Sequence, residues 1–158
     1  MIKWTFIIGG SLAALIGLAI VIGALLPRDH VASSAATIKA PQEAVWRLIT
    51  DVAAASTWRD LEKVEMIAGA STPRWKEYAK HGRLTFEQVE SVPPSKFVTR
   101  IVDTDQGFGG TWTFALAPAS GDGTRVTITE NGFITNPMFR FMSRFVFGYY
   151  GMQTQYLK

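Results

Sequence analysis

The feature that most constrains this chain is a stretch without a charged side chain, which runs from Trp4 to Leu26. As an α-helix this stretch would rise about 34 Å, enough to cross a hydrocarbon core of about 30 Å. A helix of a soluble protein shows a polar face. Here the only polar side chains are those of Thr5 and Ser11, so no such face exists. The sequence therefore predicts a transmembrane helix.

A cleaved signal peptide is the alternative interpretation of this stretch. Signal peptides have an apolar region of roughly 7–15 residues, which is shorter than the one seen here. Small residues follow at positions 33–36, but cleavage there would remove the predicted first strand. We therefore interpret residues 1–28 as an uncleaved membrane anchor and residues 29–158 as the domain behind it.

The orientation of the anchor rests on a small difference in charge. Lys3 and the α-amine precede the helix and Arg28 follows it, so the positive charges are nearly balanced. The short basic tail favours an N-terminus inside the cytoplasm and an extracytoplasmic domain. Small residues at spacing four could also let two anchors pack weakly together, namely Gly9, Ala13 and Gly17.

Composition excludes several classes of function. Lys and Arg number 16 and Asp and Glu 13, for a net charge of +3, and no basic run suggests nucleic-acid binding. The chain has no cysteine, which excludes thiolate metal sites and thiol nucleophiles. Its two histidines, His30 and His81, stand far apart in the sequence. We therefore expect no metal site and no cofactor.

Behind the anchor the pattern predicts one α+β domain. A strand at 31–38 precedes a helix at 41–51 and a short helical piece at 53–58. Six further strands are predicted at 61–68, 75–81, 84–91, 96–103, 110–118 and 124–131. Their close spacing indicates antiparallel hairpins. A final helix should begin after the N-cap Asn136, with Pro137 first, and run to Lys158.

The predicted last helix is apolar on most of its surface. A stripe that would face the sheet repeats every three or four residues: Met138, Phe141, Met142, Phe145, Tyr149, Met152 and Tyr156. One interpretation is a wide helix that packs on the core. The other is a helix that covers a large ligand, or that leans on the bilayer with Arg140 and Arg144 toward lipid phosphates.

The ordered set of elements resembles the START-like, Bet v 1-like superfamily (SRPBCC), and within it the polyketide cyclase/dehydrase type. The resemblance lies in Ala40–Asp51, Trp58-Arg59, Gly109–Trp112, Thr124–Val126 and Thr129-Glu130. It implies a helix-grip fold, in which a curved antiparallel sheet of about seven strands wraps a long C-terminal helix. It also implies a pocket for a hydrophobic ligand between the sheet and that helix, but no single reaction.

The residues predicted to line this pocket come from the strands and the last helix. They are Trp75, Tyr78, Phe86, Arg100, Trp112, Phe114, Glu130, Phe141, Met142, Phe145 and Tyr149. Alternation puts Trp75 and Tyr78 on opposite faces, so at most one of them points inward.

Glu130 is the candidate for chemistry. Alternation places it on the same strand face as Val126 and Ile128, and a buried carboxylate there needs a partner, for which we expect Arg100. The pair would be structural, would clamp a ligand, or would supply a general acid or base. If the protein is an enzyme, we expect Glu130 to form an acid–base pair with Tyr78, Arg83 or His81.

The sequence thus predicts a membrane-anchored protein that binds a hydrophobic small molecule or lipid, with residues 4–26 in the membrane. Two alternatives stay open. One is a polyketide cyclase- or dehydratase-like enzyme that uses the same cavity. The other is a protein-interaction module whose cavity is filled by its own side chains.

Overall fold

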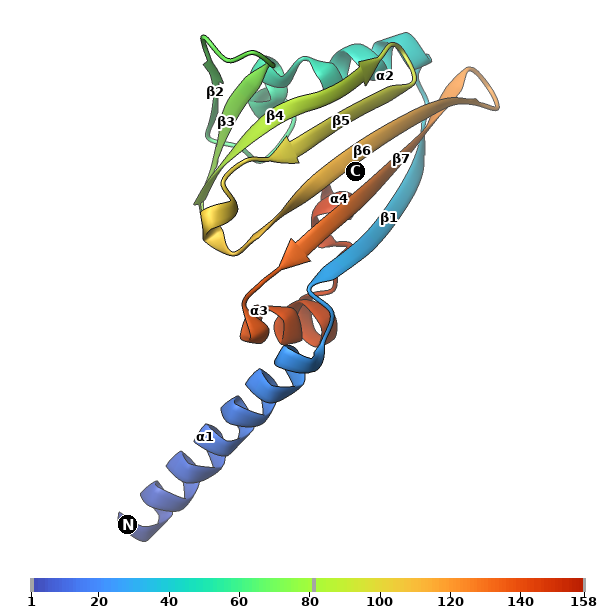
Figure 1. Ribbon diagram of the computed structural model, residues 1–158. Coiled ribbons are helices and arrows are strands. Elements are labelled where there is room, and N and C mark those ends of the chain that lie inside the picture. Colours follow the sequence, from blue (N-terminus) through green and yellow to red (C-terminus); the bar gives the residue numbers. More distant parts are fainter. Residues whose placement is uncertain (1, 81, 158) are drawn as a thin grey trace.

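The computed structural model describes residues 2–80 and 82–157. Within them, helix α1 (Ile2–Leu25) projects from an α+β domain built on a seven-stranded antiparallel sheet (Figure 1). The strands are β1 Asp29–Ile38, β2 Lys63–Ile67, β3 Arg74–Ala79, β4 Gly82–Val92, β5 Lys96–Ile101, β6 Phe108–Ala119 and β7 Gly123–Ile134. The seven predicted strands are confirmed, with ends shifted by a few residues.

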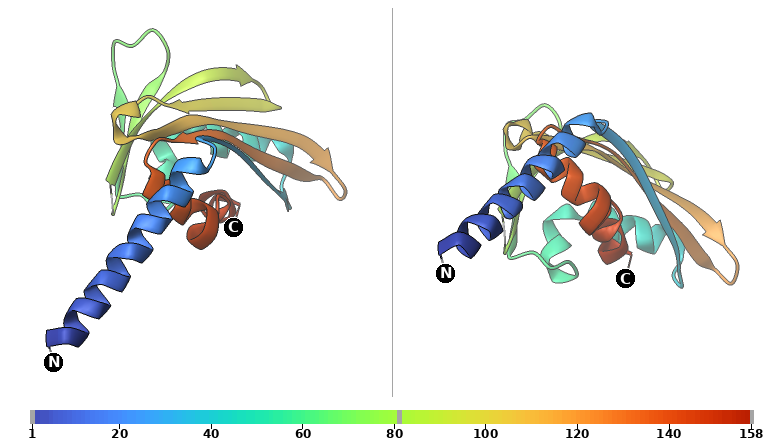
Figure 2. Two further views of the ribbon diagram at one scale, coloured as in Figure 1. Left: turned by 60° about the horizontal axis from the view of Figure 1, so that its bottom comes forward. Right: turned by 90° about the horizontal axis from the view of Figure 1, so that it is seen from below.

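The sheet order is β1-β7-β6-β5-β4-β3-β2, so every strand except β1 lies beside its neighbour in sequence. β1 instead pairs along its whole length with β7, from Asp29 opposite Phe133 to Ile38 opposite Thr124. The sheet curves strongly, and the helices of the domain gather on its concave side (Figure 2).

Helix α2 (Gln42–Thr50) crosses one end of the concave face, as its apolar periodicity predicts. Val45 and Ile49 are buried against the sheet. The Asp51 carboxylate accepts the Ala54 N–H at 3.3 Å and starts the 3₁₀ helix η1 (Val52–Thr57). Each fully buried aliphatic or phenylalanine side chain here contributes about 1.5–3 kcal/mol. The core consists of Val45, Ile49, Trp75, Phe97, Phe114, Leu116, Val126 and Ile128.

The prediction of one long C-terminal helix is wrong. Its start is confirmed, because Asn136 Oδ1 accepts the Phe139 N–H at 2.9 Å and Pro137 is the first residue of α3 (Pro137–Met142). A π-helical turn, η3 (Ser143–Phe147), follows, and the helix ends at Gly148, whose φ of 72° is not helical.

A second short helix, α4 (Gly151–Tyr156), resumes after the break. Glycine in a helix costs about 1 kcal/mol relative to alanine, and two glycines within four residues make a continuous helix here unfavourable. The break redirects the chain. α3 and η3 lie beside α1 at the end of the domain from which α1 projects, which we call the foot of the domain. α4 instead packs into the concave face of the sheet (Figures 1 and 2).

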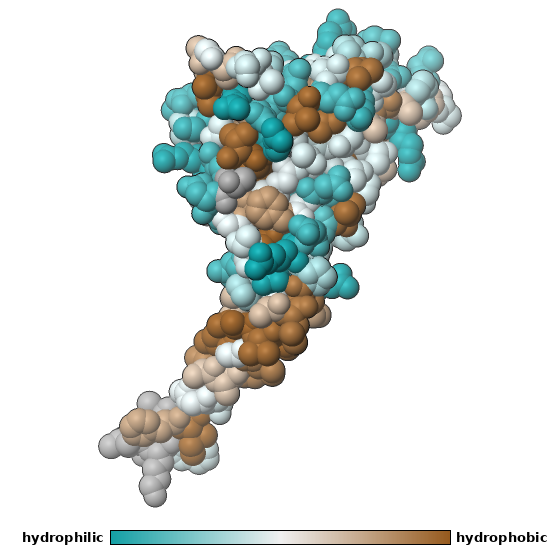
Figure 3. Space-filling view, viewed as in Figure 1, coloured by the Kyte–Doolittle hydropathy of each residue, from teal (hydrophilic) through white to brown (hydrophobic). Residues whose placement is uncertain are grey.

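In the described part of the chain, α1 is the one helix long and apolar enough to cross a membrane. Its segment Phe6–Leu25 has a mean hydropathy of 2.4 and is 6% buried. Its apolar surface stands clear of the domain in Figure 3. Only the last turns of α1 pack on the domain, where they contact α3.

Candidate functional site

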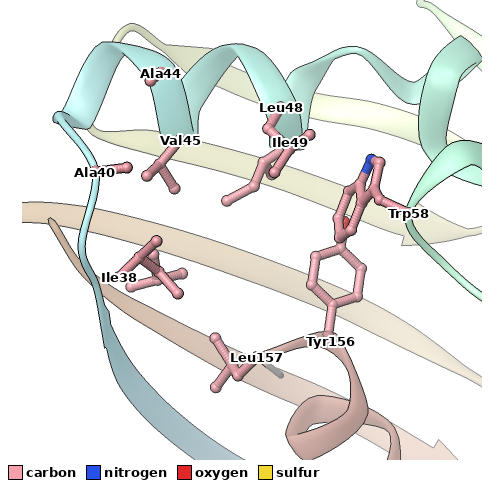
Figure 4. Close-up of a pocket in the computed structure, with 10 residues that line it drawn as sticks. Ile38, Ala40, Ala44, Val45, Leu48, Ile49, Trp58, Tyr156 and Leu157 are labelled. Carbon is pink, nitrogen blue, oxygen red and sulfur yellow. The ribbon is translucent and has the colours of Figure 1, made fainter.

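The candidate site is a cavity of about 290 Å³ under the end of the sheet that α2 covers (Figure 4). α2, the end of β1, β7, the residue after η1 and the end of the C-terminal segment enclose it. Its lining residues are Ile38, Ala40, Ala44, Val45, Leu48, Ile49, Trp58, Val126, Tyr156 and Leu157. The lining contains no charged side chain, so an uncharged and largely apolar molecule fits it best.

Hydrogen bonds fix the wall that α2 contributes to this cavity. The Gln42 amide Nε2 donates to the carbonyls of Pro94 and Leu116 at 3.1 and 3.2 Å, which ties the start of α2 to the sheet. The Thr124 hydroxyl donates to the Ala40 carbonyl at 2.7 Å. The cavity therefore has one wall held rigidly by the sheet.

The opposite wall is the end of α4, and Tyr156 is its main residue. The Tyr156 ring lies 5.0 Å from the ring of Phe114 and 5.1 Å from that of Trp58. The Arg59 guanidinium lies over its face at 4.7 Å from the centroid, a cation–π contact. Burial raises the pKa of the Tyr156 phenol to about 12, while the positive charge of Arg59 opposes the rise. This tyrosine is therefore neutral at physiological pH.

A buried ion pair lies behind Tyr156. Glu77 accepts a hydrogen bond from Arg59 Nη1 at 2.7 Å and another from the Trp75 indole N–H at 3.0 Å. The sequence analysis did not single out Glu77. The sequence does contain a signal for its inward position, because Glu77 stands two residues after Trp75 and therefore shares its strand face. The pair holds Arg59 against Tyr156, which is a structural role in this arrangement.

Glu130 lies on the concave face, as predicted, but its neighbours differ from those expected. His30 Nε2 lies 3.5 Å from Glu130 Oε1, and the Gln153 amide donates to Glu130 Oε2 at 3.4 Å and to the Ala32 carbonyl at 3.2 Å. The His30 ring stacks on Tyr149, with centroids 4.2 Å apart. Glu130 therefore helps to hold α4 onto β1 and β7.

A second, smaller cavity of about 230 Å³ lies next to this cluster, where α1 enters the domain. It is lined by Leu26, Pro27, Asp29, His30, Arg144 and Tyr149. Of the residues predicted to line the pocket, Tyr149 is the one that lines this second cavity.

The expected partnership of Arg100 with Glu130 is wrong. Arg100 lies on the convex face, where its Nε donates to Glu87 at 2.8 Å, and Arg74 Nε donates to the other oxygen of Glu87 at 3.0 Å. The hydrogen bond from Arg100 is the main cause that lowers the pKa of Glu87, with Arg74 adding to it and burial opposing it. The strand alternation that points Glu130 inward points Arg100 outward.

Tyr78 also lies on the convex face, where its hydroxyl donates to Glu65 at 2.6 Å. Its cross-strand neighbour there is Arg83. Neither residue can reach Glu130 through the sheet, and His81 lies outside the described residues. The acid–base set expected for an enzyme is therefore not assembled from Tyr78 or Arg83.

The other predicted pocket residues divide between two places. Trp75, Phe86, Trp112 and Phe114 share the concave face and belong to the core or pack against it, and none of them lines the cavity. Phe141, Met142 and Phe145 belong to α3 and η3 at the foot of the domain, away from the cavity.

Sequence reasoning missed the contribution of α2 to the cavity lining. It predicted this helix but named none of its residues among those that line the pocket. Among the described residues, no group of three His, Cys, Asp or Glu side chains is placed to hold a metal ion.

The sequence model of the family described as polyketide cyclase / dehydrase and lipid transport matches residues 29–151. The chain belongs to this family. No curated protein matches the sequence. The match of this polyketide cyclase / dehydrase and lipid transport family begins after α1 and covers the whole sheet, α2 and the foot of the domain.

Solved structures with the same fold include three of interest. A norcoclaurine synthase mutant from Thalictrum flavum has a TM-score of 0.64 at 11% identity, over 81% of this chain and 89% of that one. Protein MLL2253 from Mesorhizobium loti has a TM-score of 0.60 at 20% identity, over 80% and 90%. Zhui aromatase/cyclase from Streptomyces sp. R1128 has a TM-score of 0.56 at 16% identity, over 67% and 68%. At these identities the likeness establishes the fold alone.

Proposed function

We propose that this protein is a membrane-anchored member of the family that binds one hydrophobic small molecule or lipid chain in the cavity beneath α2. The observation that carries the proposal is the uncharged, apolar lining of that cavity, between a sheet-bound wall and the end of α4. The family description, which includes lipid transport, supports the same class of ligand.

The size of the cavity restricts the ligand. Its 290 Å³ lies just below the range of about 300–1,000 Å³ that small-molecule pockets occupy. A single ring system or one acyl chain fits such a volume better than a whole phospholipid. Binding would be driven by apolar burial, at about 25 cal/mol per Å².

The proposed anchor is α1, retained in the mature protein. β1 begins at Asp29 and pairs with β7 throughout, so signal-type cleavage at residues 33–36 would cut a fully paired strand. The Arg140 side chain also donates to the Leu26 carbonyl at 2.6 Å, a contact that cleavage would remove. The charge flanking α1 favours an extracytoplasmic domain. A tether of this kind keeps the cavity beside the bilayer, where poorly soluble ligands concentrate.

Binding is favoured over turnover by the chemistry of the lining. A cyclase or dehydratase needs an acid and a base that reach the substrate. The cavity offers the neutral Tyr156 phenol, and three predicted partners of Glu130, namely Tyr78, Arg83 and Arg100, lie on the other face of the sheet.

Native mass spectrometry of the full chain, released from detergent, tests the proposal. We expect a stoichiometric apolar molecule to stay bound to the wild type. Ala44→Phe should fill the cavity and abolish this mass, whereas Ala53→Phe, on the exposed side of η1, should retain it. If the wild type carries no ligand, and a panel of lipids and aromatic compounds leaves its melting temperature unchanged, the protein is an interaction module instead.

A further inference from the structure

The foot of the domain is held tightly against the end of α1. α3 covers one face of the last turns of α1, and at Gly23 the two helices touch so closely that a Cβ atom there would overlap the Pro137 carbonyl. That same Cβ atom would lie 3.3 Å from Phe141 Cβ. The buried Arg140 side chain donates to the Leu26 carbonyl, a favourable position for a cation at a helix C-terminus. α3 is therefore fixed relative to α1.

This packing sets the depth of α3 along the anchor. The contact face of α1 runs from Ala19 to Leu26, and α1 ends at Leu25. At 1.5 Å per residue, α3 lies beside the last 10 Å or so of the apolar helix. The apolar segment Phe6–Leu25 is about 30 Å long, which matches the hydrocarbon layer. With α1 in a bilayer, α3 therefore lies within about 10 Å of the boundary between acyl chains and headgroups.

The residues at this level are apolar and uncovered. The exposed fraction is 59% for Phe145, 58% for Val146 and 63% for Phe147, three consecutive residues of η3. Phe139 and Tyr150, on either side of them in sequence, are also exposed. A run of consecutive exposed apolar residues is unusual on a soluble surface and indicates a binding surface. In Figure 3 the apolar surface of α1 broadens where α1 meets the domain.

We propose that the foot, defined as α3, η3 and Tyr150, is a second membrane-binding element that inserts its apolar side chains into the interface of the bilayer that α1 spans. The inference rests on the proposed anchor and adds a contact that the anchor alone does not require. Amphipathic elements of this kind bury their apolar face about 5–10 Å into the headgroup boundary. Arg144 is exposed and lines the smaller cavity with Pro27 and Asp29, just past the end of α1, which puts it at the level of the lipid phosphates.

The consequence is a fixed orientation of the domain on the membrane. A single helix would let the domain swing, whereas a helix and a docked foot hold it in one position. Because α4 begins directly after the foot, at Gly151, the α4 wall of the cavity is then held close to the bilayer.

Site-directed spin labelling tests the depth of the foot directly. The chain has no cysteine, so a single introduced cysteine carries the only label. Val146→Cys reports on the foot, and Val89→Cys is a matched control on β4, where Val89 is 48% exposed. Ala13→Cys reports whether α1 itself is inserted. The full chain is placed in vesicles of phosphatidylcholine and phosphatidylglycerol, and collisions with oxygen and with a water-soluble nickel chelate are measured.

We expect the label at position 146 to collide several-fold less with the nickel chelate than the label at position 89, and more with oxygen. Equal nickel accessibility at the two positions, with Ala13→Cys shielded, would overturn the docking of the foot and leave the anchor intact. Nickel accessibility at Ala13→Cys as well would overturn both. Neither result bears on ligand binding, which mass spectrometry tests separately.

A pair of glycine variants tests whether α3 positions the foot. Gly23→Leu replaces the residue at the contact with Pro137, whereas Gly17→Leu adds the same side chain where no atom lies within 4 Å of the new Cβ. Both changes keep α1 apolar. In the Val146→Cys background, Gly23→Leu should restore nickel accessibility and Gly17→Leu should not. The same accessibility in both variants would show that the packing of α3 on α1 does not hold the foot at the membrane.

Discussion

The two halves of the C-terminal segment differ in composition and in environment: α3 and η3 are rich in Phe and Met and α4 is mostly polar, yet most of η3 is exposed. In η3, Phe147 is 63% exposed, and in α4, Gln153 is fully buried and Tyr156 is enclosed by the rings of Trp58 and Phe114. The backbone break at Gly148 separates the two halves. Apolar and aromatic content therefore does not determine which half is buried. The direction of the chain after the break determines it. The break turns α4 onto the sheet and leaves η3 exposed to a partner outside the domain.

The largest effect should come from removing the ring that anchors the buried half. Tyr156→Ala leaves a void among Trp58, Trp112 and Phe114, and large-to-small changes of this kind cost about 3–5 kcal/mol. Tyr150→Ala, in the exposed half, is the matched control and should change the free energy of unfolding by less than about 0.5 kcal/mol. Denaturant unfolding of the full chain in detergent measures both. Equal losses would show that the two halves are not distinguished by burial.

The second prediction concerns alkaline pH. In the folded protein the phenol of Tyr156 has its pKa raised from 10.0 to about 12 by burial, so the unfolded chain ionises first. Stability from this group is present below pH 10 and is lost as the pH rises toward 12. A shift of two pKa units corresponds to roughly 2–3 kcal/mol. Tyr156→Phe should lack this loss. The unfolding free energy of the variant minus that of the wild type should therefore increase over that interval. A constant difference would contradict the buried position of the phenol.

Much of the fold could be predicted from the sequence. Period-two alternation and turn residues located all seven strands, because each strand has one buried face and short connections. The side of the sheet on which Glu130 lies followed from the same alternation. The C-terminal helix was overextended because its apolar periodicity was counted and its two glycines, Gly148 and Gly151, were not weighed against it.

The site was harder to predict than the sheet. Alternation gives the face of each residue but not its neighbours across the cavity, so Trp112 and Phe114 were placed on the correct face while the lining from α2 was missed. Arg100 was assigned to Glu130 from charge alone, although the strand register pairs it with Glu87. The contact of Gly23 with Pro137 joins residues 114 positions apart, and no local sequence pattern predicts it.

The smallest effect should come from the exposed half itself. Phe147→Ser removes a large ring that contacts little of the domain, so the unfolding free energy in detergent should change by no more than about 0.5 kcal/mol. Phe114→Ser, at a site that is 3% exposed, provides the buried reference and should cost several kcal/mol. The contrast separates two explanations of an apolar surface. A phenylalanine that stabilised the fold would lose stability on replacement, whereas one that serves an external partner loses only that contact. A cost for Phe147→Ser close to that of Phe114→Ser would assign the foot to the core and remove the basis for membrane docking.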